Sequence, residues 1–123
     1  MKPHFHGLRT TIYKVTDIAQ AKAWYSKAFG VKPYFDEPFY VGFNIGGYEL
    51  GLQPDFNIPI SKVGSVITYW GVDDATKSYQ RLLELGAGEF EKPTEVGEGI
   101  VVAAVKDPWG NVIGVIYNPT FKL

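Results

Sequence analysis

The same order of structural signals occurs twice along this chain, and the repeat limits the possible fold more than any other feature. Each half has a β-branched stretch, an Asp suited to cap a helix, an amphipathic stretch and then three more strand-like stretches. The halves align with Val15 on Val72 and Asp17 on Asp74. An internal repeat of one supersecondary unit, βαβββ, is therefore predicted, and with it an α+β fold.

The first half can be divided into elements at its glycines and prolines. Apolar residues at steps of three and four predict a helix from residue 18 until Gly30 ends it. The strands of this half are predicted at residues 8–15, 33–35, 39–45 and 48–52. Residues 53–64 contain two prolines and little periodicity, which is typical of a connection between modules.

The second half is predicted to end in a β-hairpin over residues 100–117. In its turn, Pro108 sets φ, Gly110 can adopt a positive φ, and Asp107 can hydrogen-bond the backbone two residues on. The elements before this hairpin are predicted as a strand at 66–72, a helix at 75–85 with its cap at Asp73-Asp74 and its end at Gly86, and a proline-interrupted edge strand at 90–96.

One helix covers only one face of a four-stranded sheet, so each module leaves a second face uncovered. We therefore expect a cupped mixed β-sheet with the helices on its outer face and the function in the concavity. Residues 1–123 are predicted to form a single domain of two modules, 7–55 and 64–119. By strand alternation, Tyr69 should face the concavity and Trp70 should pack beneath the helices.

Composition excludes several classes of protein. The 123 residues carry a net charge of −1, so no basic surface is available for nucleic acid or for a membrane. The chain has no cysteine, which excludes disulfides and thiolate sites. Hydrophobic residues make up 46% and aromatic residues 15%, enough for a packed core. No stretch resembles a signal peptide or a membrane span, and a cytoplasmic protein is expected.

Several short motifs resemble those of one superfamily. They are a Val-x-Asp after the first strand (Val15, Asp17), an aromatic pair in the first helix (Trp24-Tyr25) leading to Ala28-Phe29-Gly30, and the turn Asp107-Pro108-Trp109-Gly110-Asn111. In order, spacing and duplication they resemble the vicinal oxygen chelate superfamily, which includes glyoxalase I, extradiol dioxygenases, and fosfomycin- and bleomycin-resistance proteins. The resemblance covers nearly the whole chain and implies the fold of that superfamily.

Metal enzymes of that superfamily resemble one another in carrying a His on the first strand of each half and a Glu on the last. Counted along the motifs, these four positions fall on Thr10, Ile67, Gly51 and Gly114. None of these side chains is an imidazole, a thiolate or a carboxylate, so no metal and no other cofactor is expected. A shift of two residues in the first hairpin puts Glu49 in the third position, which still gives only one ligand. His4 and His6 alternate like a metal pair, but histidines near a terminus are more often solvated.

Glu49 is the candidate catalytic residue. It lies on the strand face of Gly47 and Gly51, so it should point into the concavity. Partial desolvation, with Tyr69 opposite, is expected to raise its pKa and prepare it to accept a proton or to bind a cationic or hydroxyl group. Lys14 could meet an anionic group, and a solvated surface lysine is the alternative. The predicted ligand-binding residues are Thr10, Ile12, Lys14, Glu49, Ile67, Tyr69 and Gly114.

Three functions remain open at this point, and the sequence does not decide whether the protein is an enzyme. The first is metal-independent binding of a small aromatic or amphipathic molecule by a homodimer, as the resemblance to the bleomycin-resistance branch implies. The second is a glyoxalase-like lyase or isomerase, or a dioxygenase, with a metal held by other residues. The third is a metal-free enzyme with Glu49 as general base.

Overall fold

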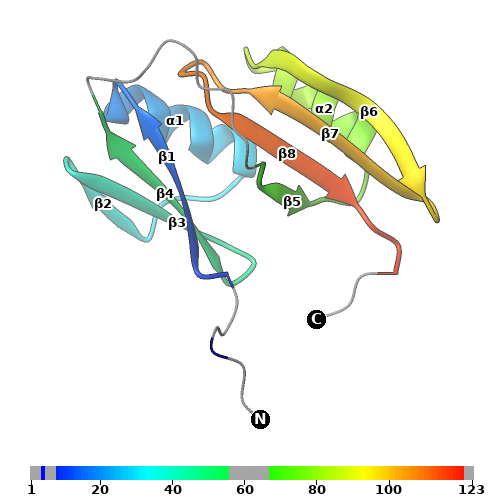
Figure 1. The fold of residues 1–123 in the computed structure, drawn as a ribbon. Helices are drawn as coiled ribbons and strands as arrows, with labels where there is room; N and C mark the ends of the chain where they lie inside the picture. The colour runs from blue at the N-terminus through cyan, green and yellow to red at the C-terminus, as the bar shows by residue number, and fades with distance from the viewer. Residues whose placement is uncertain (1–3, 5–7, 56–66, 121–123) are drawn as a thin grey trace. The chain divides into compact units, whose positions relative to one another are not determined.

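The computed structural model describes residue 4 and residues 8–55 and 67–120, and the chain divides into two compact units, 1–58 and 59–123. Each unit is a four-stranded mixed sheet with one helix packed against it (Figure 1). The predicted α+β class is therefore confirmed.

The first unit follows the predicted order of elements. They are β1 (Thr10–Val15), α1 (Ile18–Phe29), β2 (Phe35–Glu37), β3 (Tyr40–Ile45) and β4 (Tyr48–Pro54). The order in the sheet is β1-β4-β3-β2, where β1 is parallel to β4 and the other neighbours are antiparallel. The first strand of the unit is thus paired with its last, which brings Thr10 beside Glu49.

The second unit has the same topology, which confirms the predicted βαβββ repeat. Its elements are β5 (Tyr69–Gly71), α2 (Ala75–Glu84), β6 (Gly88–Gly97), β7 (Ile100–Lys106) and β8 (Val112–Tyr117). The order in the sheet is β5-β8-β7-β6, and β5 is parallel to β8. The pairing of β5 with β8 brings Tyr69 beside Gly114.

Both helices begin at the predicted aspartates. The side chain of Asp17 accepts a hydrogen bond from the amide of Gln20 at 3.0 Å, and Asp74 accepts one from Lys77 at 3.0 Å. Each bond satisfies an amide that has no partner within the first helical turn. α1 ends at Gly30, whose φ of 70° is left-handed, as predicted. Among the described residues, no helix combines the length and the apolar character that crossing a membrane requires.

The core of each unit lies between its helix and the side of the sheet that faces it. Leu50 and Leu52 of β4 are fully buried, as the alternation along this strand predicts. Tyr25 of α1 is also fully buried and stacks on Tyr13 of β1, with ring centroids 5.7 Å apart. In the second unit Trp70 is buried, so its predicted place in the core is confirmed.

The predicted turn between β7 and β8 is present and is built around the carboxylate of Asp107. Its Oδ1 accepts hydrogen bonds from the backbone amides of Trp109 at 2.9 Å and Asn111 at 2.7 Å. Its Oδ2 accepts one from the side-chain amide of Asn111 at 2.9 Å. Gly110 adopts the expected positive φ of 88°. Asp107 is only 4% exposed, so these bonds satisfy a carboxylate that is almost fully buried.

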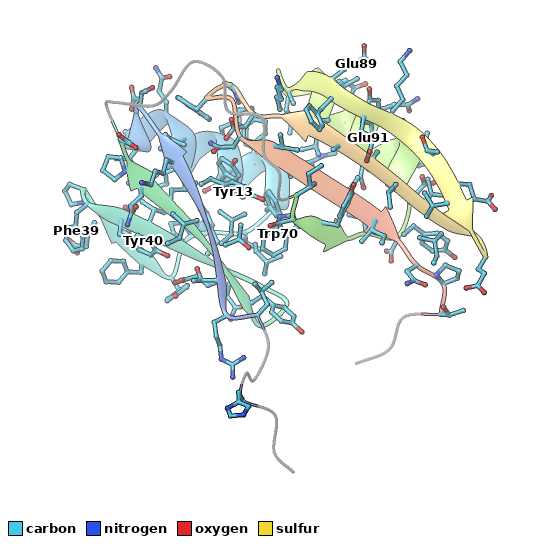
Figure 2. The ribbon with its side chains drawn as sticks, viewed as in Figure 1. Tyr13, Phe39, Tyr40, Trp70, Glu89 and Glu91 are labelled. Carbon is cyan, nitrogen blue, oxygen red and sulfur yellow. The ribbon has the colours of Figure 1, made fainter. Side chains whose placement is uncertain are left out.

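Strand β6 differs most from its prediction, because it covers ten residues and not the short stretch 90–96. Shifts in its register against β7 mark bulges, which let an edge strand continue through Pro93. The hydroxyl of Tyr79 on α2 donates to Oε2 of Glu89 at 2.6 Å and fastens the start of β6 to the helix. This hydrogen bond raises the pKa of Tyr79 to about 12. Glu89 and Glu91 are labelled on this strand in Figure 2.

Other strand ends also differ from the predicted ones. β4 continues beyond Leu52, because Gln53 and Pro54 still pair with β1. β2 covers residues 35–37 and not 33–35, and β3 begins at Tyr40 because Phe39 lies in the turn between them. The remaining differences are that β1 begins at residue 10, that β5 covers only residues 69–71, and that residues 56–66 of the predicted connection and strand lie outside the described residues.

Candidate functional site

The face of each sheet opposite its helix is called its open face. In the first sheet, residues 10, 12 and 14 of β1 pair with residues 49, 51 and 53 of β4. Residues paired in register share a face, so Thr10, Ile12, Lys14 and Glu49 lie together on the open face. Nζ of Lys14 lies 3.7 Å from Oδ2 of Asp55. The ligand-binding role of these four residues stays a prediction.

Glu49 lies at the centre of a hydrogen-bonded cluster. The hydroxyl of Tyr34 donates to its Oε2, and that of Tyr40 donates to its Oε1 at 2.9 Å. Tyr40 can reach Glu49 because Gly51 has no side chain; a Cβ there would clash with the Tyr40 hydroxyl. Gly42 leaves space in the same way, since its Cβ would lie 2.9 Å from Oε2 of Glu49. We call Glu49, Tyr34 and Tyr40 the carboxylate cluster.

The carboxylate cluster lowers the pKa of Glu49, so the expected raised pKa is wrong. The hydrogen bond from Tyr34 is the largest cause, followed by one from Thr10, and the opposing effect of burial is smaller. The bond to Glu49 raises the pKa of Tyr34, and burial raises the pKa of Tyr40. The prediction failed because it considered desolvation and did not include hydroxyl donors from neighbouring strands. Glu49 is therefore an anion at neutral pH.

Beside the carboxylate cluster lies a hollow of about 150 Å³. It is lined by Arg9, Tyr34, Asn44, Gly47, Tyr48 and Glu49, all of the first unit. The main chain joins its two charged residues, because the amide of Glu49 donates to the carbonyl of Arg9 at 3.1 Å. A hollow of this size accommodates a small polar group and not a whole drug-sized ligand.

Aromatic rings adjoin the carboxylate cluster on the side of β2 and β3. The ring centroid of Phe35 lies 6.0 Å from that of Phe39 and 6.2 Å from that of Tyr40. Figure 2 shows Phe39 and Tyr40 at the β2–β3 end of the sheet. Phe39 and Tyr34 are 65% and 62% exposed, although rings of this size are usually buried. The fixed anion is thus bordered by apolar surface that faces solvent.

The second sheet carries a different Tyr–Glu pair on its open face. Tyr69 pairs in register with Gly114, and its ring covers that glycine closely; a Cβ on Gly114 would lie 2.6 Å from the ring. The Tyr69 hydroxyl donates to Oε1 of Glu91 on β6 at 2.9 Å. Burial and then this bond raise the pKa of Tyr69. Ile67 lies just before β5 and is half-buried. Tyr69, expected opposite Glu49, therefore has a carboxylate partner within its own sheet.

The residues at the aligned metal positions do not fit a metal ion. The β1–β4 register puts Glu49, the residue reached by the two-residue shift, beside Thr10, and Gly51 beside Ile12. Glu49 brings one carboxylate, and both of its oxygens already accept tyrosine hydroxyls. Wherever the structure describes side chains, no three His, Cys, Asp or Glu residues are grouped closely enough to hold a metal. His4 is exposed, and His6 lies outside the described residues.

Sequence reasoning missed Tyr34 and Tyr40, the two hydroxyl donors to Glu49. No local pattern links a tyrosine to a carboxylate on another strand, so the sequence singled out neither ring. A usable signal for Tyr40 was alternation, since Tyr40, Gly42 and Asn44 share one face of β3. Tyr34 precedes β2. Its backbone amide donates a hydrogen bond of 2.9 Å to the carbonyl of Gly42, and this bond fixes its position.

Comparison with known proteins agrees with the resemblance of the motifs. The chain matches the family model of the Glyoxalase/Bleomycin resistance protein/Dioxygenase superfamily over residues 7–115. The protein belongs to this superfamily. One curated relative of this superfamily member is "Uncharacterized protein YurT" of Bacillus subtilis (strain 168), which is 34% identical over 77 residues. The match covers 57% of this chain and only 60% of that relative.

Solved structures share the fold of this superfamily member. A glyoxalase-related enzyme from Fulvimarina pelagi has a TM-score of 0.77 at 18% identity, over 97% of this chain and 93% of that one. A lactoylglutathione lyase from Agrobacterium tumefaciens has a TM-score of 0.73 at 22% identity, over 98% and 100%. At these identities the likeness establishes the fold and not the activity.

Proposed function

We propose that this superfamily member binds a small aromatic or amphipathic molecule, without a metal ion, on the open face of its first sheet. The observation that carries the proposal is the pair of hydrogen bonds that the hydroxyls of Tyr34 and Tyr40 donate to Glu49. These bonds hold the carboxylate in one orientation, and its lowered pKa keeps it charged. A fixed anion on an exposed face can bind a cationic or hydroxyl group of a ligand.

The aromatic rings beside the carboxylate cluster support an apolar part in the same ligand. Phe39 and Tyr34 are largely exposed, and Phe35 adjoins both Phe39 and Tyr40. Binding sites for small molecules combine such apolar walls with a few fixed polar groups that orient the ligand. The proposed ligand therefore has an apolar body and one hydrogen-bond-donating or cationic end.

The two enzymatic alternatives have less support. A general base works best with a pKa near the working pH, whereas the pKa of Glu49 is lowered from its ordinary value of 4.5. A metal-dependent lyase, isomerase or dioxygenase needs a set of ligands, and Glu49 is one carboxylate beside a threonine. Binding is thus the function that the chemistry of these residues supports best.

We also propose that the protein is a homodimer. Exposed apolar side chains on the first unit, among them Phe39 and Ile12, are the kind of surface that a partner subunit covers. Analytical ultracentrifugation at micromolar protein concentration should give the mass of two chains. A single-chain mass at that concentration would contradict this part of the proposal.

The binding proposal is tested by a screen of small amphipathic amines and alcohols for stabilisation against heat, with protein dialysed against a chelator. We expect hits that keep their effect without metal and lose it in Glu49→Gln, with metal analysis of the untreated protein below one ion per chain. Glu91→Gln is the matched control, because it alters the Tyr–Glu bond of the other sheet. Hits that need an added metal, or that survive Glu49→Gln, would refute the proposal.

A further inference from the structure

The hollow beside the carboxylate cluster contains one charged group of each sign. Glu49 and Arg9 both line it, and Nη1 of the Arg9 guanidinium donates to the carbonyl of Leu8 at 3.3 Å. Tyr34, Asn44, Gly47 and Tyr48 complete the lining. A ligand with a single charge would be attracted by one of these two residues and repelled by the other.

We propose that this hollow receives a zwitterionic head group, such as that of an α-amino acid with an apolar side chain. In this arrangement the ammonium group of the ligand faces Glu49, and its carboxylate faces Arg9. The inference rests on the proposed function and deepens it, because it names the chemical class of the ligand.

The two charged residues that line the hollow suit the two charges of such a head group. Both oxygens of Glu49 already accept a tyrosine hydroxyl, so the carboxylate is held in one orientation and has lone pairs left for an ammonium donor. Arg9 already donates to the Leu8 carbonyl through Nη1, but a guanidinium has five N–H donors in a planar fork, which matches the two oxygens of a carboxylate better than a lysine would. The bond of 3.1 Å from the Glu49 amide to the Arg9 carbonyl fixes the spacing between the two residues at the main chain.

The size of the hollow limits what can occupy it. About 150 Å³ is enough for a small charged head group, and an apolar side chain must then lie outside it. Tyr34 lines the hollow and is 62% exposed, so its ring offers a surface for that side chain. Phe35 lies beside Tyr40 of the carboxylate cluster and beside Phe39, and adds apolar surface there. Amino acids with aromatic or long aliphatic side chains fit this arrangement best.

Three probes of similar size separate the charges. L-Phenylalanine carries both charged groups, phenethylamine carries only the ammonium, and 3-phenylpropionate carries only the carboxylate. Each is titrated into the protein and followed by amide chemical shifts around residues 44–49. We expect L-phenylalanine to bind at least about tenfold more tightly than either singly charged probe, which corresponds to about 1.4 kcal/mol for the second charge contact.

Variants at the two charged residues sharpen the test. Arg9→Gln should weaken the binding of L-phenylalanine about tenfold. Phenethylamine should bind as tightly as before or more tightly, because a cation that repels its ammonium group has been removed. Glu49→Gln should weaken the binding of L-phenylalanine and of phenethylamine to a similar extent. Arg81→Gln on α2 is the matched control for loss of one positive charge, and it should change none of the three affinities.

The outcome can contradict the inference without contradicting the proposed function. If phenethylamine binds as tightly as L-phenylalanine and depends on Glu49 but not on Arg9, the ligand is a simple cation and the zwitterion inference fails. If none of the probes binds while hits from the amine and alcohol screen still depend on Glu49, the inference fails and the binding function stands. If neither the probes nor any screened compound binds through Glu49, both fail.

Discussion

The open faces of the two units use the same parts in different ways. In the first unit a carboxylate on the inner strand β4 accepts two tyrosine hydroxyls, whereas in the second a tyrosine on the edge strand β5 reaches a carboxylate on the opposite edge. In both, a glycine without a side chain leaves space for a ring, Gly51 for Tyr40 and Gly114 for Tyr69. The sheet topology and the N-terminal helix caps, Asp17 and Asp74, agree between the units. The comparison indicates that a repeated unit can keep its framework while its solvent-facing side acquires separate chemistry.

The hairpins before the last strand of each unit differ in a similar way. In the first unit, Oδ1 of the exposed Asn44 accepts one amide, that of Gly47, at 2.8 Å. In the second unit, the nearly buried Asp107 accepts three hydrogen bonds. The same reversal of the chain thus depends on buried polar groups in one unit and on an exposed side chain in the other.

The largest difference in the loss of stability is expected between mutations in these two turns. Asp107→Ala leaves the amides of Trp109 and Asn111 without their acceptor in a buried turn, so the free energy of unfolding should fall by about 3 kcal/mol. Asn44→Ala removes one exposed hydrogen bond and should cost less than about 1 kcal/mol. Urea unfolding of both variants measures the two losses. Similar losses would mean that burial of the turn contributes nothing extra.

The next contrast concerns the two glycines beneath the rings. Gly114→Ala would put a Cβ 2.8 Å from the backbone carbonyl oxygen of Thr68, which cannot move freely, so a loss of about 2 kcal/mol is expected. Gly51→Ala would put a Cβ against the hydroxyl and ring of Tyr40, a side chain that can rotate away at the loss of its bond to Glu49, and should cost about 1 kcal/mol. Unfolding in denaturant checks the order of the two losses. The reverse order would show that the Tyr40 ring is held more firmly than the β5 backbone.

Mutations of the two helix caps should cost the two units similar amounts of stability, because both caps make the same hydrogen bond. Asp17→Ala and Asp74→Ala each remove one bond to an amide in the first helical turn, so each should lower the free energy of unfolding by about 1 kcal/mol. Asn at either position can still cap and serves as the conservative control. A large difference between the two alanine variants, measured by thermal unfolding, would break the equivalence of the units.

The smallest effect on stability is expected from the ionisation of Glu49. Its pKa is lower in the folded protein than its ordinary value of 4.5, so folding favours the carboxylate. This contribution is complete above pH 4.5 and is lost as the pH falls through the folded pKa. The stability of the native protein minus that of Glu49→Gln should therefore decrease below pH 4.5. Carboxyl NMR gives the pKa directly, and Tyr34→Phe should raise it; a pKa at or above 4.5 in the native protein contradicts the expectation.

The elements of the fold could be predicted because their signals are local. Asp17 and Asp74 cap the helices from within the next turn, and Asp107 closes its turn within four residues. The length of β6 could not be predicted, because its bulges depend on pairing with β7 and on contact with α2. Strand alternation correctly put Glu49 on the face opposite Leu50.

The surroundings of Glu49 could not be predicted in the same way. Its pKa depends on hydroxyls of Tyr34 and Tyr40, which come from a loop and another strand, and their distance is set by sheet register. The choice between Gly51 and Glu49 as the residue beside Thr10 had the same difficulty, since neither strand alone determines the register between β1 and β4. Only the paired sheet shows that Thr10 and not Ile12 is the neighbour of Glu49.

The parallel pairing of the first strand of each unit with its last has a consequence for folding. In the first unit β1 is held at the sheet edge by β4, its one neighbouring strand. During synthesis β1 leaves the ribosome first and must wait, unpaired, until nearly the whole unit has followed. The β3–β4 hairpin can form early from nearby residues, whereas closure of the long loop to β1 is slow. We therefore expect the last step in assembling the first unit to be the docking of β1, the strand of that unit made first.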